Sequence, residues 1–239
     1  MRLPYSEMKQ EKFLLIELFF ISVMLIFMIR LIKKAAYISL AAAACSLFFS
    51  CSKAGDISVQ NGATAFRAGR LDDALEFFIK AVNEERRYSD ELVYNSISNI
   101  YAAKEDIANA AVYLEKAVEG KPDYRSYVTL GSYYQSLKNY EKADFYYNKA
   151  IKMNPKKGEA YASLGSLFIE TDNLEKAVEN LEKGVELTPE IAVIHANLAL
   201  AYAMQGNMEK SDDEFKIADK MQCVNLDRFE EKIQALRKN

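Results

Sequence analysis

The chain has 239 residues, of which 50% are hydrophobic and 12% aromatic, so it is not a disordered polypeptide as a whole and holds enough apolar material for a medium-sized domain. The first 50 residues contain 6 of the 31 basic and 3 of the 34 acidic residues, which leaves a net charge of about −6 on the remainder. This acidic balance argues against a nucleic acid or an anionic membrane surface as the main electrostatic partner.

The N-terminal region, residues 1–50, carries two apolar blocks that are separated by the basic stretch RLIKK. If translation starts at Met28, a short basic segment with Arg30, Lys33 and Lys34 precedes an apolar segment too short to span a bilayer comfortably. A small residue and a cysteine follow. This order is typical of a secretory signal.

Cys51, at the end of LFFSC, resembles the lipidated cysteine of a bacterial lipoprotein signal. The resemblance implies a membrane-anchored lipoprotein of the cell envelope that faces the periplasm or the exterior, with residues 51–54 as a short tether. Cys45, which follows LAAAA, is the alternative acylation site. If translation starts at Met1 instead, residues 13–29 are expected to form a first membrane helix of about 17 residues.

A repeat with a period of about 34 residues fills the rest of the chain. It is marked by small residues separated by 36, 33, 34 and 34 positions: Ala74, Ala110, Ala143, Ala177 and Ser211. Twelve residues before each of them stands another small residue: Gly62, Ser98, Gly131, Gly165 and Ala199. Four residues after each stands a large one: Phe78, Leu114, Tyr147, Leu181 and Phe215. The three middle copies end in a proline: Pro122, Pro155 and Pro189.

Over residues 55–223 this pattern resembles the tetratricopeptide repeat (TPR) family, and YVTLGSYYQSLKNYEKADFYYNKAIKMNP is its clearest copy. The resemblance implies an all-α, right-handed superhelical solenoid of five helix-turn-helix repeats. Their approximate bounds are 55–90, 91–123, 124–157, 158–191 and 192–223. In residues 224–239, apolar side chains recur on one helical face, which predicts a helix that caps the solenoid.

The residues of the pattern have physical roles in such a hairpin. Small side chains let the two helices approach closely, large ones fill the space between helix pairs, and proline ends the second helix. Short polar residues at the bends are expected to cap the helix that follows: Asp106, Asn139, Asn173 and Asn207.

In TPR proteins, fixed positions of the first helix of each repeat line a concave groove. Carried over to this chain, the resemblance implies a set of partner-binding side chains: Asn95, Asn99, Arg125, Ser132, Gln135, Ser166, Ile169, Leu200 and Met204. Asn95 and Asn99 are expected to hold a peptide backbone through their amides. The apolar members Ile169, Leu200 and Met204 either receive an apolar anchor of the partner or pack against the capping helix.

Some family members bind an acidic chain terminus with paired lysines and arginines on this surface. Here the fifth positions of the repeats are not basic: Val59, Asn95, Val128, Ala162 and Ala196. A carboxylate clamp is therefore not expected.

The sequence contains no glycine-rich phosphate loop, nucleophile elbow or metal-ligand spacing, so we predict no catalytic residues, no metal and no cofactor. His195, the single histidine, occupies the aromatic position of its repeat and is expected to pack in the core. Cys223 is expected to be a free thiol.

Two functions are consistent with these features. The first is a non-enzymatic, lipid-anchored scaffold whose groove binds a peptide or helical segment of an envelope protein, with no nucleic acid and no small-molecule substrate. The alternative is an accessory structural subunit of an envelope machine, such as a solute transporter, an outer-membrane assembly complex or a pilus biogenesis system.

Overall fold

The computed structural model describes residues 53–238, and its helices lie in the compact unit that begins at Ala54. Met28, Cys45, Cys51 and the expected membrane helix at 13–29 lie outside the described residues. Within 53–238, none of the helices combines the length and the apolar character needed to cross a bilayer.

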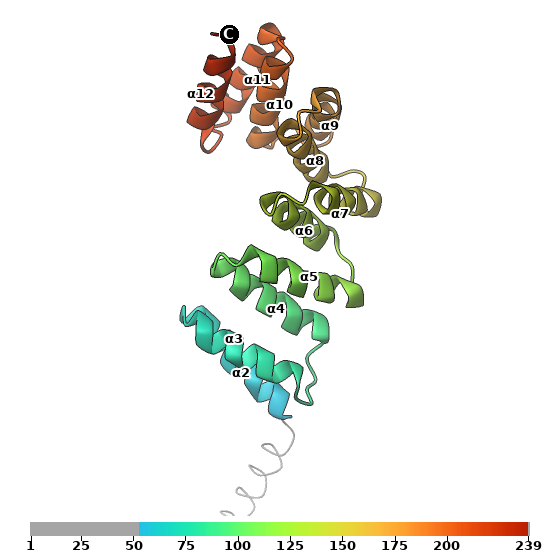
Figure 1. The fold of residues 1–239 in the computed structure, drawn as a ribbon, viewed down its shortest axis with the longest axis vertical. Coiled ribbons are helices and arrows are strands. Elements are labelled where there is room, and N and C mark those ends of the chain that lie inside the picture. Colours follow the sequence, from blue (N-terminus) through green and yellow to red (C-terminus); the bar gives the residue numbers. More distant parts are fainter. Residues whose placement is uncertain (1–52, 239) are drawn as a thin grey trace, which may run out of the picture. The chain divides into compact units, whose positions relative to one another are not determined.

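Five helical hairpins follow one another in chain order, and a final helix packs against the last of them (Figure 1). The hairpins are α2 (Ala54–Arg67) with α3 (Leu71–Val82), α4 (Asp90–Ala103) with α5 (Ile107–Gly120), α6 (Tyr124–Ser136) with α7 (Tyr140–Met153), α8 (Gly158–Glu170) with α9 (Leu174–Leu187), and α10 (Ala192–Met204) with α11 (Met208–Lys220). The last helix, α12 (Leu226–Leu236), contacts α10. The prediction of five repeats and a capping helix is confirmed.

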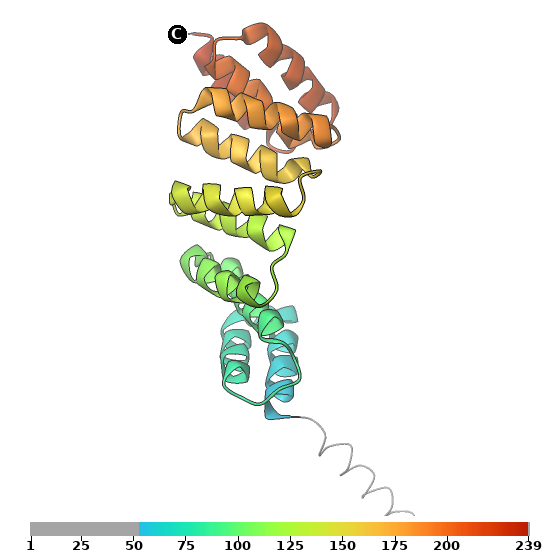
Figure 2. The ribbon, with the colours of Figure 1, turned by 90° about the vertical axis from the view of Figure 1, so that its right-hand side faces the viewer.

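The two helices of each hairpin have different neighbours, as the side view in Figure 2 helps to follow. Each second helix packs against the first helix of the next hairpin, while α6 also packs directly against α8, and α8 against α10. These first helices therefore lie close to one another and form the inner face of the stack.

The first helix begins at Ala54, the last residue of the predicted tether, and so one residue earlier than expected. The backbone N–H of Gly55 donates to the carbonyl oxygen of Glu85 at 3.1 Å. The carboxylate of Asp56, which is 1% exposed, accepts hydrogen bonds from the backbone N–H and the guanidinium of Arg87 at 2.8 and 2.6 Å. These contacts with the loop after α3 fix the start of α2.

The bends of the last four hairpins share one hydrogen-bond arrangement. After α4, the backbone N–H of Asp106 donates to the carbonyl of Tyr101 and ends that helix, while its side chain accepts from the N–H of Asn109 and begins α5. Asn139, Asn173 and Asn207 cap the next helices in the same way, so the predicted caps are confirmed.

Each of the five hairpin bends has one residue in the left-handed conformation, with φ between +56° and +81°. Glycine adopts it freely and stands at two bends, Gly69 and Gly206. Glu105, Lys138 and Asp172 adopt it at the other three bends, because the surrounding hydrogen bonds fix the turn.

The helices that precede the prolines end two residues before them, at Gly120, Met153 and Leu187. The first repeat has Arg86 in place of the proline. Its guanidinium Nη1 donates to the carbonyls of Ala81 and Val82 at 2.6 and 3.0 Å, so a buried side chain completes the end of α3.

The crossing of the two helices in a hairpin leaves no room for a side chain at the glycines of the pattern. A methyl group on Gly131 would lie 2.4 Å from Cδ1 of Tyr147. The same relation holds for Gly62 with Phe78 and for Gly165 with Leu181, at 2.8 and 2.5 Å. The large residue of each of these repeats thus packs directly on the glycine of the same repeat.

We expect Gly131→Ala to lower the free energy of unfolding by about 1–3 kcal/mol, because the added methyl group must displace the buried Tyr147 ring. Gly120→Ala is the matched control, since no atom lies within 4 Å of the new methyl group. Urea unfolding measures both. An equal response of the two variants would contradict a close helix crossing at Gly131.

A cluster of hydrogen-bonded polar side chains connects the second and third hairpins. Glu115 Oε1 accepts hydrogen bonds from the hydroxyls of Tyr134 and Tyr146 at 2.7 and 2.8 Å and from Lys142 Nζ at 3.1 Å. Lys142 Nζ also lies 4.3 Å from the centre of the Tyr134 ring. Partial burial raises the pKa of Glu115, but these hydrogen bonds outweigh it, so the pKa lies below its ordinary value.

A related cluster recurs two repeats further along, where Tyr202 donates to Glu182 and Lys210 lies over its ring. Between these two, Phe168 has no hydroxyl, and Asn148 stands where the glutamate would be. Lys176 still lies over the Phe168 ring. At these three junctions the carboxylate and the tyrosine are thus present together or absent together, whereas the first junction has Tyr101 but Ile79 in place of the glutamate.

Glu115→Gln is expected to lower the free energy of unfolding by about 1 kcal/mol at neutral pH, after allowance for the partial exposure of the pair. Because the pKa of Glu115 is lower in the folded state, its contribution is complete above the ordinary value of 4.5 and is lost as the pH falls through the folded value. The difference between wild type and variant should therefore vanish in acid. Glu119→Gln, on an exposed part of α5, should show no such difference at any pH.

Candidate functional site

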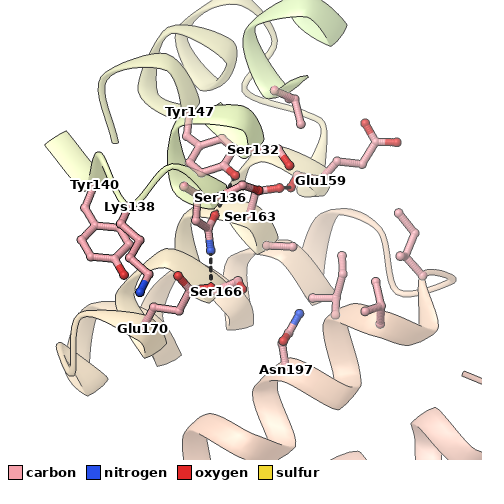
Figure 3. A pocket seen from close by; sticks show the side chains of 16 residues that line it. Ser132, Ser136, Lys138, Tyr140, Tyr147, Glu159, Ser163, Ser166, Glu170 and Asn197 are labelled. Carbon is pink, nitrogen blue, oxygen red and sulfur yellow. Dashed lines mark hydrogen bonds between the residues drawn. The ribbon is translucent and has the colours of Figure 1, made fainter. Parts of the chain in front are cut away.

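A hollow with a volume of about 630 Å³ lies on the inner face of the stack (Figure 3). Its walls come from α6, α8 and α10, with contributions from α7 and the loops before α7 and α10. The lining residues are Val128, Ser132, Gln135, Ser136, Lys138, Tyr140, Tyr147, Glu159, Ala162, Ser163, Ser166, Glu170, Ile191, Val193, Ile194 and Asn197. The volume is in the range of ligand-binding clefts.

The lining follows from helical periodicity. On α8, positions 159, 162, 163, 166 and 170 lie on one face because they are three or four residues apart. The opposite face of this helix is apolar and contains the buried Leu164 and Leu167. α6 contributes polar side chains in the same way, and α10, which is mostly apolar and buried, contributes Asn197.

Three of the predicted groove residues line this hollow: Ser132, Gln135 and Ser166. Asn95, Asn99 and Arg125 lie on α4 and at the start of α6, outside it. Asn99 and Arg125 are exposed, and Asn95 is half-buried. Their part in binding remains a prediction.

The apolar end of the predicted groove requires a correction. Leu200 is 4% exposed and belongs to an apolar cluster with Ile233 of α12, and Ile169 and Met204 pack against the same cluster. The expectation that Leu200 receives an anchor from a partner is therefore wrong, because the capping helix already covers it. Leu200 thus has the packing role, while Ile169 and Met204 are half-buried beside this cluster.

A chain of hydrogen bonds crosses the hollow from α7 to α8. The hydroxyl of Tyr147 donates to Gln135 Oε1 at 2.8 Å, and Gln135 Nε2 donates to Glu170 Oε1 at 2.8 Å. Burial, and next the charge of Glu170, raise the pKa of Tyr147 above its ordinary value. The phenol therefore stays protonated and fixes which end of the Gln135 amide faces the carboxylate.

Sequence reasoning missed part of the lining: Lys138, Tyr140, Tyr147, Ser163, Ile191, Ile194 and Asn197. Ser163 and Asn197 stand 14 residues before Ala177 and Ser211, so a comparison of this repeat position across copies would have identified them. The repeat pattern predicts a core position for Tyr147. Its ring is buried as expected. Because Gly131 has no side chain, the Tyr147 ring packs directly on the backbone of α6, and the Tyr147 hydroxyl reaches Gln135.

A second, smaller hollow of about 480 Å³ lies between α2 and α4, and Phe78 of α3 also lines it. Its lining is more apolar and includes Val59, Ala63, Tyr88 and Leu92, the last of which is 41% exposed.

His195 lies in the core of the last hairpin and is 4% exposed. Its Nδ1 lies 2.6 Å from Glu214 Oε2, and its Nε2 lies 3.0 Å from the carbonyl oxygen of Pro189. Both ring nitrogens are thus used to connect α10 with α11 and with the preceding loop, in agreement with the expected packing role.

Within residues 53–238 no group of three histidine, cysteine, aspartate or glutamate side chains has an arrangement that could hold a metal ion. In the same part of the chain, Cys223 is a free cysteine, and burial raises the pKa of its thiol.

The stacked hairpins and their concave hollow define a helical-repeat fold, and comparison with known proteins identifies the repeat. Residues 92–124 and 124–157 match the family model of the tetratricopeptide repeat, and residues 165–206 match a second model described as TPR repeat. These matches confirm that the chain contains tetratricopeptide repeats. A search of curated proteins gives no match.

Several solved structures share this fold. A MamA crystal structure superposes with a TM-score of 0.62 at 22% identity, covering 70% of this chain and 91% of that one. MamA from Desulfovibrio magneticus RS-1 gives 0.63 at 18% identity, covering 72% and 96%. YrrB, described as a TPR protein with an unusual peptide-binding site, gives 0.60 at 22% identity, covering 76% and 91%. At these identities the likeness establishes the fold.

Proposed function

We propose that this protein is a non-enzymatic interaction scaffold that binds a peptide or helical segment of a partner protein in the hollow between α6, α8 and α10. The observation that carries this proposal is the polarity of the lining. Among the described residues, the side chains of Ser132, Ser166 and Asn197 make no hydrogen bond to another residue, although all three line the hollow. Hydroxyl and amide groups of this kind can bind a peptide backbone.

The shape of the site supports a peptide rather than a small molecule. The hollow is open and extends across three successive first helices, so an extended chain can contact several repeats. YrrB, which shares the fold, is described as having a peptide-binding site.

A photocrosslinking amino acid at Ser132, which is exposed in the hollow, is expected to give discrete adducts with a partner protein in cells. The same amino acid at Glu179, exposed on the second helix α9, is the control and should give none of these adducts. Denaturing electrophoresis and mass spectrometry identify the products.

The pattern of adducts also tests the choice of function. Adducts from Glu179 alone would contradict the proposal, because binding would then use the outer helices. A single partner recovered in fixed stoichiometry through every purification step would favour the alternative, an accessory subunit of an envelope machine.

We further propose that the scaffold is anchored in the cell envelope by a lipid on Cys51. The support is the order of a basic segment, an apolar segment and a cysteine that precedes the first helix by a few residues. Since α2 begins at Ala54, a lipid at Cys51 would hold the first hairpin within about 10 Å of the membrane surface even with the intervening residues extended.

Mass spectrometry of the mature protein tests the anchor. We expect an N-terminal residue 51 that carries a diacylglyceryl group, and Cys51→Ala should leave the protein unprocessed and without this mass. Modification at Cys45 would shift the site, and an unmodified chain that starts at Met1 or Met28 would overturn the lipoprotein proposal.

A further inference from the structure

The carboxylate of Glu170 is held in a fixed position at the hollow. It is the last residue of α8, and Gln135 of α6 donates to its Oε1 at 2.8 Å. Gln135 is itself oriented by Tyr147, which is 2% exposed. The buried Tyr147 thus orients the exposed Glu170 through the amide of Gln135 (Figure 3).

This arrangement leaves the carboxylate able to accept further hydrogen bonds. A carboxylate has about four acceptor sites, and Gln135 uses one of them. No lysine or arginine among the described residues forms an ion pair with Glu170. The side chain is exposed, so a partner can reach it.

The charge of the hollow is predominantly negative. Glu159 and Glu170 lie at the two ends of α8, and Lys138 is the basic side chain in the lining. The fifth positions of these repeats, Val128 and Ala162, provide no cation for an acidic peptide. An acidic segment would meet like charge here, whereas a basic side chain would meet a carboxylate that is already oriented.

We propose that the hollow selects a peptide segment with an arginine or lysine side chain, which pairs with Glu170 while the serine and asparagine side chains bind the backbone. This inference rests on the proposed function and names the chemistry of the partner. The orientation of Glu170 matters because a group that is fixed before binding loses little rotational freedom when the pair forms. Arginine suits the site best, since its planar fork can donate two hydrogen bonds to one carboxylate.

The test uses the full chain, purified in detergent micelles, and a phage-displayed library of random dodecapeptides. Glu170→Gln is the informative variant, because its amide oxygen can still accept from Gln135 Nε2 while the charge is lost. Glu175→Gln, exposed in the first turn of α9, is the matched control. Thermal unfolding of all three proteins checks that the fold is retained.

We expect wild type and Glu175→Gln to enrich peptides with arginine or lysine, and Glu170→Gln to lose this enrichment. A synthetic peptide from the wild-type pool should bind Glu170→Gln about three- to tenfold more weakly than wild type, and its Arg→Gln version should lose about as much on wild type. That version should bind wild type and Glu170→Gln equally.

Two other results would overturn the inference, and they can be distinguished. Enrichment of neutral or acidic peptides, or basic peptides that bind Glu170→Gln as well as wild type, would refute the pairing with Glu170 and leave the peptide-binding scaffold in place. If no peptide is enriched at all, both the inference and the proposed function fail.

Discussion

The close crossing of the two helices in each hairpin is the constraint on which the rest of the structure depends. At Gly131 the backbone of α6 lies directly against the ring of Tyr147, and the equivalent glycines of other repeats make the same contact with Phe78 and Leu181. This close contact fixes the distance and the angle between the two helices of a hairpin. Each hairpin therefore has a defined surface on which the next hairpin packs. The inner face, and with it the hollow, is a consequence of this repeated geometry.

The same contact connects packing with the candidate site. Tyr147 fills the space that Gly131 leaves open, and its hydroxyl orients Gln135, which in turn holds Glu170. A core residue therefore acts on a surface carboxylate through two hydrogen bonds. A site built in this way is preorganised without a loop that must close, which suits a scaffold that selects partners by chemistry.

Much of the architecture could be predicted because it is encoded locally and repeated. A short polar residue such as Asn139 or Asn173 caps a helix by accepting from a backbone N–H three residues further on, so it can be recognised without the fold. Leu200 shows the limit of this reasoning. The same repeat position faces the groove in other copies, but α12 covers it at Leu200. The spacing of residues within a repeat does not indicate where a helix outside the repeats will pack.

The sequence by itself determined the number of hairpins, their caps and the small-to-large contacts, because each of these depends on residue types at a fixed spacing. The tertiary structure decided which polar side chains meet. Tyr147, Gln135 and Glu170 come from three different helices, and their hydrogen bonds depend on the distance and angle at which the hairpins stack. That stacking geometry results from many packing contacts together, so it cannot be predicted from the spacing of residues within one repeat.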